Sequence, residues 1–219
     1  MKRVIGLVLG LVAAGAAQRF DYQVRNDFFA GFAGNRPALE RAMKATEAAL
    51  AENPRQAEAL AWHGSGLFSQ AGEAFQKGER EKGIELWARS TREMDDAVVL
   101  EPDNVAVRAV RGSVYNQSSV TLPPERGRPL LEKAMADYEK ILEVQKDHFA
   151  KLGQHPRGEV LFGLGHGWYR LGNQDKARGY FDRVVRELPG TEYEKRARVW
   201  LETKTLSKEQ MTCYGCHVQ

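Results

Sequence analysis

The sequence predicts an all-α protein assembled from repeated helical hairpins. Three observations lead to this prediction. Apolar residues recur in helical patterns along most of the chain, small residues stand at corresponding places in successive segments, and prolines close those segments. No segment shows a convincing strand pattern, and no glycine-rich phosphate-binding loop follows a predicted strand. We therefore expect paired helices and no sheet.

One hairpin is clearest, in residues 161–189. Its key positions are a small residue, an aromatic, an alanine, a second aromatic and a closing proline, namely Gly165, Trp168, Ala177, Phe181 and Pro189. The small residue and the alanine allow two helix backbones to approach closely, and the aromatics fill the space beside that crossing. Gly172 ends the first helix because glycine accepts a left-handed backbone, and a proline stops the second helix.

This order and spacing closely resemble the tetratricopeptide repeat (TPR) family. The resemblance implies a solenoid, a right-handed superhelix of antiparallel hairpins whose concave face binds peptides or proteins. Looser copies of the pattern contain Gly112 with Tyr138 and Gly64 with Met94. The faintest copy contains Ala30, which lies one family period before Gly64.

These copies give about four hairpins and a terminal helix. The hairpins lie between Asn26 and Pro189, and Glu192 to Thr203 forms a helix over the open end. We assign residues 18–206 to this helical array, and we expect the charged runs within it to be solvated helix faces.

Three stretches of the array depart from the family pattern. Extra residues in the second hairpin fall around Gln70 to Lys82, and their helix-favouring composition predicts lengthened helices. Prolines and a glycine between Ser118 and Pro129 predict a loop inside the third hairpin. A third irregular stretch, Lys151 to Pro156, joins the third hairpin to the fourth.

Residues 1–17 have the features of a secretory signal peptide. Lys2 and Arg3 form a basic start, Val4 to Val12 is mainly apolar, and small residues suited to a signal peptidase follow. The apolar stretch is short for a span of about 20 residues, so cleavage is favoured over a retained anchor. We expect export to the bacterial periplasm, the cell surface or the medium, with no stable membrane span after cleavage.

The composition is that of an ordinary soluble protein, with 42% hydrophobic and 28% charged residues among 219. Removal of the two basic leader residues leaves 30 basic against 29 acidic residues, so the formal charge falls from +3 to +1. This near-neutral charge does not indicate nucleic acid or an anionic membrane as a partner.

A covalent haem-attachment motif lies in a C-terminal tail of residues 207–219. Cys213 and Cys216 are the only two cysteines of the chain, and His217 follows directly. In c-type haem proteins two such thiols add to the haem vinyl groups, and the adjacent histidine binds iron as the proximal ligand. The motif occurs once. We therefore expect one covalent haem c per chain.

Other interpretations of the cysteine pair remain open. A lone pair in an exported protein can form a disulfide. A thiol-disulfide motif normally lies at a helix N-terminus beside a strand, and no strand is indicated here. A zinc site would want a fourth ligand, whereas the other histidines are scattered along the chain. The spacing and the adjacent histidine favour haem over these alternatives.

The motif does not supply the distal ligand of the haem. Only two residues follow His217, so we expect this ligand from upstream or from another chain. The imidazole and thioether candidates are His63, His148, His155, His166, Met94 and Met135. We favour His166 or His155. We expect His63 at a helix contact and Met94 in the core.

The TPR resemblance also implies a groove for a protein partner. The residues at the family's concave positions are Phe68, Asn116, Gln117, Phe162, His166, Tyr169 and Arg170. Because His166 belongs to this set, it is a candidate for partner binding as well as for haem ligation.

Together these features favour an exported monohaem c-type cytochrome on a TPR scaffold. Its haem would transfer single electrons, and its repeats would dock on a redox partner protein, on other cytochromes, or on further copies of the chain in an oligomer or filament. The alternative is an interaction or assembly module whose haem is structural or sensory. We do not expect an enzyme such as a peroxidase, because no catalytic distal residues are identifiable.

Overall fold

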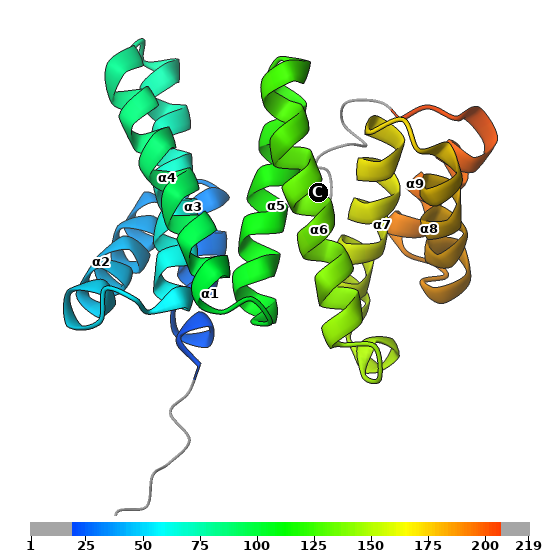
Figure 1. Cartoon of the computed structure of the whole chain (residues 1–219), viewed down its shortest axis with the longest axis horizontal. Coiled ribbons are helices and arrows are strands. Elements are labelled where there is room, and N and C mark those ends of the chain that lie inside the picture. The colour runs from blue at the N-terminus through cyan, green and yellow to red at the C-terminus, as the bar shows by residue number, and fades with distance from the viewer. Residues whose placement is uncertain (1–18, 207–219) are drawn as a thin grey trace, which may run out of the picture.

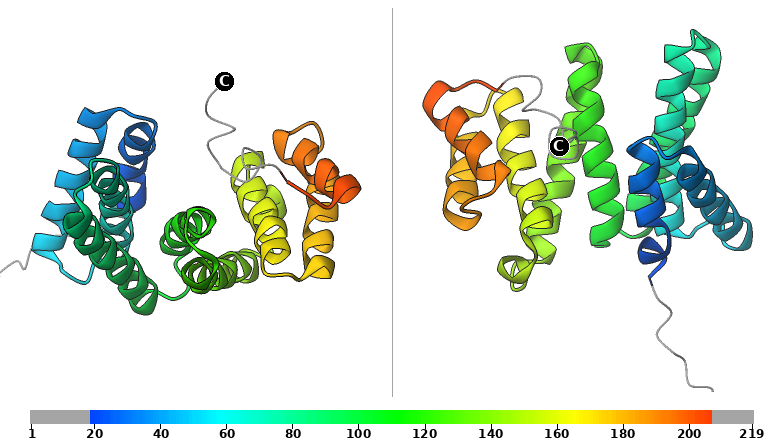
Figure 2. Two further views of the ribbon diagram at one scale, coloured as in Figure 1. Left: turned by 90° about the horizontal axis from the view of Figure 1, so that it is seen from above. Right: turned by 180° about the vertical axis from the view of Figure 1, so that it is seen from behind.

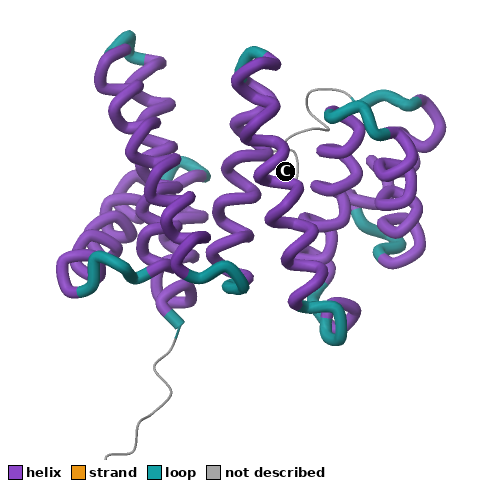
Figure 3. Tube along the Cα trace, viewed as in Figure 1, coloured by secondary structure: helices purple, strands orange, loops and turns teal. Residues whose placement is uncertain are grey.

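The computed structural model describes residues 19–206, and within this range the regular structure is helical (Figures 1 and 3). The helices are α1 (Phe20–Phe32), α2 (Arg36–Glu52), α3 (Ala57–Gln76), α4 (Arg80–Leu100), α5 (Val105–Thr121), α6 (Pro124–Val144), α7 (Gln154–Arg170), α8 (Gln174–Glu187) and α9 (Glu192–Thr203), with a 3-10 turn η1 at Phe149–Lys151. The leader and the haem-attachment motif lie outside the described residues.

Consecutive helices pack as hairpins, α1 on α2, α3 on α4, α5 on α6 and α7 on α8, and α9 then packs on α8. Viewed from above, the hairpins follow one another around an arc (Figure 2). Within residues 19–206, the prediction of an all-α array of four hairpins and a terminal helix is therefore confirmed.

Sequence-encoded caps set the turn inside the fourth hairpin. Helix α7 ends at Arg170, and Gly172 takes the left-handed backbone predicted for it, with a φ of 85°. The Asn173 side chain then accepts a hydrogen bond of 3.0 Å from the Lys176 backbone N–H, which starts α8. The turn is thus fixed locally by a glycine and an N-cap asparagine.

Glycines allow the two helices of a hairpin to approach closely. A Cβ on Gly165 would lie 2.8 Å from the Phe181 ring, and a Cβ on Gly64 would lie 2.9 Å from the Ser90 carbonyl oxygen. Gly112 takes the corresponding place in the third hairpin, against α6. These three glycines are the small residues that the repeat pattern places at the helix crossings, so that prediction is confirmed.

The first hairpin differs from the family spacing. Its close approach is at Gly31, where a Cβ would lie 2.7 Å from the Leu39 Cβ, whereas Ala30 is only half-buried. One residue along a helix turns the side chain by about 100°, so Ala30 does not face α2 as Gly31 does. The family period therefore placed this contact one residue too early.

The second hairpin has the lengthened helices that its extra residues predicted. Helix α3 continues to Gln76 and α4 begins at Arg80, so their turn is short. Both helices are longer than α7 and α8, and their tip projects beyond the neighbouring first hairpin (Figure 1).

The predicted loop in the third hairpin is wrong. Helix α5 runs to Thr121 and α6 begins at Pro124, because Pro123 takes the N-cap position and Pro124 the first helical position, where proline is tolerated. Pro129 lies inside α6. The loop residues of the prediction thus extend both helices instead.

The connection to the fourth hairpin is only partly irregular. The 3-10 turn Phe149–Lys151 lies within it, but α7 already begins at Gln154. His155 and Pro156 therefore belong to the first turn of α7. The N–H groups of a first turn make no hydrogen bond within the helix, so a proline at this position costs no hydrogen bond.

A buried ion-pair network joins the second and third hairpins. The Arg111 guanidinium on α5 donates two hydrogen bonds to the fully buried Asp137 on α6, at 2.8 and 2.7 Å, and a third of 3.0 Å to Asp95 on α4. Arg108 adds a bond of 2.7 Å to Asp137. Because each buried charge has a partner, this network ties three helices together.

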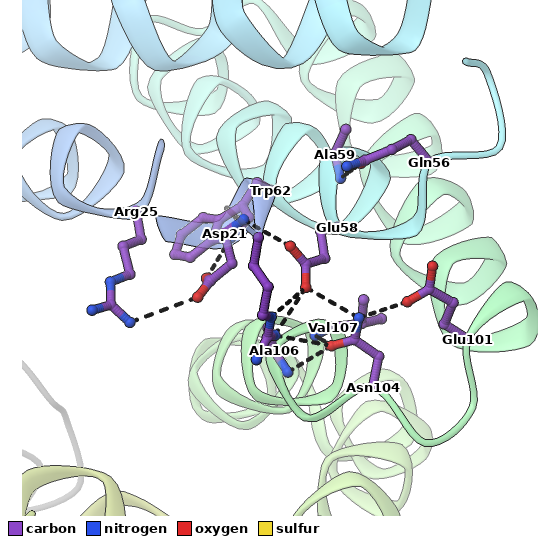
Figure 4. A network of polar contacts seen from close by, with 11 residues as sticks. Asp21, Arg25, Gln56, Glu58, Ala59, Trp62, Glu101, Asn104, Ala106 and Val107 are labelled. Carbon is purple, nitrogen blue, oxygen red and sulfur yellow. Dashed lines mark hydrogen bonds and ion pairs between the residues drawn. The ribbon is translucent and has the colours of Figure 1, made fainter. Parts of the chain in front are cut away.

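A second network fixes the N-terminal helix (Figure 4). The Glu58 carboxylate, at the start of α3, accepts hydrogen bonds from Arg19 at 2.9 and 3.0 Å, from the Asp21 backbone N–H at 2.7 Å and from Asn104 at 3.2 Å. The Trp62 indole N–H donates to the Asp21 carboxylate at 3.0 Å. One carboxylate thus connects the starts of α1, α3 and α5.

We predict that Gly165→Ala destabilises the protein and that Gly179→Ala does not. The new methyl group at residue 165 meets the buried Phe181 ring, which should lower the free energy of unfolding by about 1–3 kcal/mol. A Cβ on Gly179, on α8, meets nothing within 4 Å, so its substitution should stabilise the helix by up to about 1 kcal/mol. Urea unfolding measures both effects. Equal changes in the free energy of unfolding would contradict the close approach of the two helices at Gly165.

We predict that Glu58→Gln removes part of the acid sensitivity of the protein. Burial alone would raise the pKa of Glu58, but the hydrogen bonds from Asp21, Asn104 and Arg19 outweigh burial and lower it. This carboxylate therefore contributes stability above the ordinary glutamate pKa of about 4.3, and the contribution is lost as pH falls through the lowered folded pKa.

The gap in unfolding free energy between wild type and Glu58→Gln should be full at neutral pH and should close in acid. Glu40→Gln, at an exposed position on α2, should show no such gap. Urea unfolding as a function of pH measures the gap, and a gap of constant size would contradict the role of the Glu58 carboxylate.

Candidate functional site

The predicted haem-attachment residues Cys213, Cys216 and His217 lie outside the described residues, so their role stays a prediction. The described chain does place every upstream candidate for the distal ligand. Met94 and Met135 are 0% and 1% exposed and pack in the core, where a Cβ on Gly64 would lie 2.9 Å from Met94. Met94 therefore packs in the core as predicted.

His166 is a buried histidine with an unsatisfied nitrogen. Its side chain lies on α7 and is 1% exposed, and its Nε2 atom has no hydrogen-bond partner. Burial, with a smaller contribution from the Arg170 charge, lowers the pKa of His166 to about 3. The imidazole is therefore neutral at physiological pH, which is the form that binds metals.

His63 has the same burial but satisfied hydrogen bonding. It is also 1% exposed, and its Nδ1 lies 2.6 Å from a carboxylate oxygen of Glu93 on the facing helix α4. Burial would raise the pKa of Glu93, but bonds with His63 and Arg89 outweigh it and lower that pKa. His63 is thus a helix-contact residue, as the sequence predicted.

The other two histidines are exposed. His155 is the second residue of α7, its Nδ1 lies 3.2 Å from the Tyr193 hydroxyl, and its side chain is 61% exposed. His148 precedes the 3-10 turn and is also exposed. Of the four imidazoles, His166 is the one with a buried nitrogen that lacks a hydrogen bond.

Arg170 lies one helical turn after His166 and connects α7 to α5. It donates to the Ser119 hydroxyl at 2.8 Å, to the Ser119 carbonyl, and to the Asn116 carbonyl at 3.4 Å. The Ser119 carbonyl is available because the residue four positions later is Pro123, which has no N–H to continue the helix ladder. A proline at the end of α5 thus creates the acceptor that holds Arg170.

The predicted groove residues occupy two separate places. On α3, the Phe68 ring packs against Trp87 in a tilted arrangement, with ring centroids 5.4 Å apart. The α5 and α7 residues meet through the bond between Arg170 and the Asn116 carbonyl, and Gln117 is half-buried beside Asn116.

The α7 members of the groove are partly covered. Phe162 is 7% exposed and packs against Phe181, with ring centroids 5.4 Å apart. The Tyr169 ring lies 5.6 Å from Trp200 on α9. Sequence patterns did not single out Trp200 or Ser119 as neighbours of this region, although the proline four residues after Ser119 is a readable signal.

Buried polar atoms without hydrogen bonds gather in the C-terminal half of the described chain. They are Asn116 Oδ1, Arg157 Nε, His166 Nε2, Trp168 Nε1 and Trp200 Nε1. Such atoms are rare in folded proteins because each one costs about 1–3 kcal/mol. Four of the five lie on α7 and α9, so this region is where a ligand or partner would satisfy most unfulfilled bonds.

Other kinds of site have little support in residues 19–206. No group of three histidine, cysteine, aspartate or glutamate side chains within this range is placed to hold a metal ion. None of the described helices is long and apolar enough to cross a membrane. Two surface hollows, beside Pro102 and beside Trp168, are not lined by His166, so contact with its Nε2 requires side chains to move.

Comparison with known proteins adds little beyond the fold. No protein-family model matches the chain, and no curated protein matches it. Among solved structures, the crystal structure of a thermophilic TPR protein from Thermus thermophilus is similar, with 19% sequence identity and a TM-score of 0.37. The match covers 83% of this chain and 98% of that one.

We predict opposite effects for leucine at the two buried histidines. In a haem-free chain carrying Cys213→Ser and Cys216→Ser, His166→Leu should raise the free energy of unfolding by about 1–3 kcal/mol, because it removes an unsatisfied buried nitrogen. His63→Leu should lower it, because the Glu93 carboxylate loses one of its two partners and keeps only Arg89. Urea unfolding at pH 7 measures both changes. Destabilisation by both His166→Leu and His63→Leu would contradict the presence of an unsatisfied nitrogen on His166.

Proposed function

We propose that this protein is an exported monohaem c-type cytochrome whose helical array docks on a protein partner. The observation that carries the proposal is the motif of Cys213, Cys216 and His217, which uses the only two cysteines of the chain. The thiols would hold haem c through thioether bonds, and the His217 imidazole would bind the iron as proximal ligand. When bound, the haem supplies reversible one-electron chemistry.

The described residues offer a suitable second ligand. An imidazole that binds iron must be neutral and must have a free nitrogen, and the His166 imidazole has both properties. His155 is the weaker candidate because both of its nitrogens have polar neighbours: Nδ1 lies 3.2 Å from the Tyr193 hydroxyl, and Nε2 lies 4.0 Å from a Glu159 carboxylate oxygen. We therefore place His166 ahead of His155.

The tail is long enough to reach the array. His217 is the eleventh residue after Leu206, which packs against the C-terminal core. An extended chain spans up to about 3.6 Å per residue, so the reach is roughly 40 Å, more than the diameter of a small domain. The same length would also allow the haem to lie against a neighbouring molecule, in an oligomer or filament.

The scaffold supports docking on proteins. Arrays of helical hairpins expose extended concave surfaces, and the arc of this chain has the same construction. A redox partner protein, another cytochrome or a further copy of the chain would dock there, outside the cytoplasm. The described residues Phe68, Gln117 and Tyr169 remain partly accessible for such contacts.

A second candidate function follows from the burial of His166. Because its Nε2 is buried, the iron would keep an open distal side unless neighbouring side chains move. An open iron binds small gases, so the chain would then be an interaction module with a sensory haem.

The proposal predicts a covalently attached haem. The exported full chain, produced with a c-type maturation system, should give a haem-stained band on a denaturing gel and a c-type redox-difference spectrum. Cys213→Ser combined with Cys216→Ser should abolish the stain, and Tyr214→Phe, inside the motif, should keep it. An unstained wild-type band would overturn the proposal.

The distal ligand is tested on the same protein by its electronic spectrum. Wild type should be six-coordinate and low-spin with a nitrogenous ligand. His166→Ala should convert it to a five-coordinate form that binds carbon monoxide readily, whereas His155→Ala should leave it unchanged. A five-coordinate wild type would instead favour the sensory function, and loss of the low-spin spectrum in His155→Ala alone would assign that residue.

A further inference from the structure

Arg170 differs from Arg108, Arg111 and Arg157, the other largely buried arginines of the described array, because it lacks a carboxylate partner. Arg108 and Arg111 pair with Asp137 at 2.7 Å, and Arg157, at the other end of α7, pairs with Glu187 at 3.3 Å. All hydrogen bonds of Arg170 within residues 19–206 go to the neutral oxygens of α5. Its positive charge is therefore partly buried without a counter-ion.

The lack of a carboxylate partner has an electrostatic cost for Arg170. Burial disfavours a charged group unless an opposite charge compensates it. For Arg111 burial is outweighed by the aspartates and the pKa rises, whereas burial lowers the pKa of Arg170 because nothing opposes it. Neutral carbonyls at the end of α5 orient the guanidinium but supply less than a full negative charge.

The position of Arg170 relates it to His166. The two residues are four apart on α7, so their side chains lie on one face, about 6 Å apart along the helix axis. That face holds an unsatisfied imidazole nitrogen that is almost fully buried, and beside it an uncompensated cation. A ligand that carries both a metal centre and a carboxylate would satisfy both groups at once.

We propose that Arg170 binds a propionate carboxylate of the chain's own haem while His166 faces its iron. This inference rests on the proposed function. A haem has its iron at the centre of the ring and two anionic propionates at one edge, so a ligand and a cation on one helix face suit its chemistry. The planar guanidinium forms paired, charge-assisted hydrogen bonds with carboxylates, which a lysine cannot reproduce.

The experiment uses the haem-loaded full chain with Arg170→Gln, Arg170→Lys and the control Arg157→Gln. Arg157 lies on the same helix but already has a carboxylate partner. Loss of the cation leaves the propionate charge uncompensated, so Arg170→Gln should lower the reduction equilibrium constant by up to about tenfold, or about 59 mV for one electron. Arg170→Lys should recover most of the potential, and Arg157→Gln should leave it unchanged.

Contact between Arg170 and the propionate carboxylate is measured separately from the reduction potential. The propionate bending band in the resonance Raman spectrum should shift in Arg170→Gln and in Arg170→Lys, because both lose the paired hydrogen bonds, but not in Arg157→Gln. Circular dichroism and the haem-stained gel confirm that each variant is folded and loaded. An unstained wild-type chain would refute the proposed function itself, whereas a stained chain whose band and potential ignore Arg170 would refute this inference alone.

An acidic peptide is the other source of a carboxylate, and the test separates it from haem. An aspartate- and glutamate-rich peptide is titrated against the haem-free Cys213→Ser, Cys216→Ser chain with and without Arg170→Gln. No Arg170-dependent binding is expected. Peptide binding that requires Arg170, together with an unshifted propionate band in the loaded chain, would overturn the haem assignment and make Arg170 a partner-binding residue.

Discussion

The close approach of two helices at a glycine is the contact on which the rest of this array depends. Gly64, Gly112 and Gly165 each face the second helix of their hairpin, where an added Cβ would lie 2.9, 3.2 and 2.8 Å from its nearest neighbour, too close at Gly64 and Gly165 and tight at Gly112. Because Gly165 must face Phe181, the next residue points about 100° away, off the hairpin interface. This constraint fixes the direction of His166, and one turn later that of Arg170. The packing that builds the hairpin therefore also orients the candidate site.

The sequence could predict this much because the hairpins are specified locally. Small residues at the crossings, the glycine and asparagine of the α7–α8 turn, and closing prolines act within a few residues of one another. The failed loop near Pro123 shows the limit of such signals. Two prolines indicated a break, but at the N-cap and first position of α6 they instead permit a helix to begin. Composition alone does not distinguish these cases.

Only part of the candidate site could be predicted from local sequence patterns. Repeat spacing placed His166 on α7, but its burial and its unsatisfied nitrogen depend on how several helices close around it. The bond from Arg170 to Ser119 spans two hairpins, so no local pattern contains it. Its cause is nevertheless in the sequence, since Pro123 leaves the Ser119 carbonyl without a backbone donor. Long-range contacts become predictable only where such a missing partner is recognised.

The contrast between satisfied and unsatisfied buried groups points to α7 as the helix that carries the candidate site. The Arg111–Asp137 pair and the His63–Glu93 contact show that this fold can complete the bonds of buried charges and imidazoles. Within residues 19–206, His166 has a buried nitrogen without a hydrogen bond, and Arg170 has no carboxylate partner. Thioether bonds would hold a haem without any binding cavity, so the array needs to supply only one ligand and one counter-ion. For the proposed haem, an ordinary hairpin solenoid with these two residues on one helix face would meet that requirement, because covalent attachment, and not shape complementarity, would keep the cofactor in place.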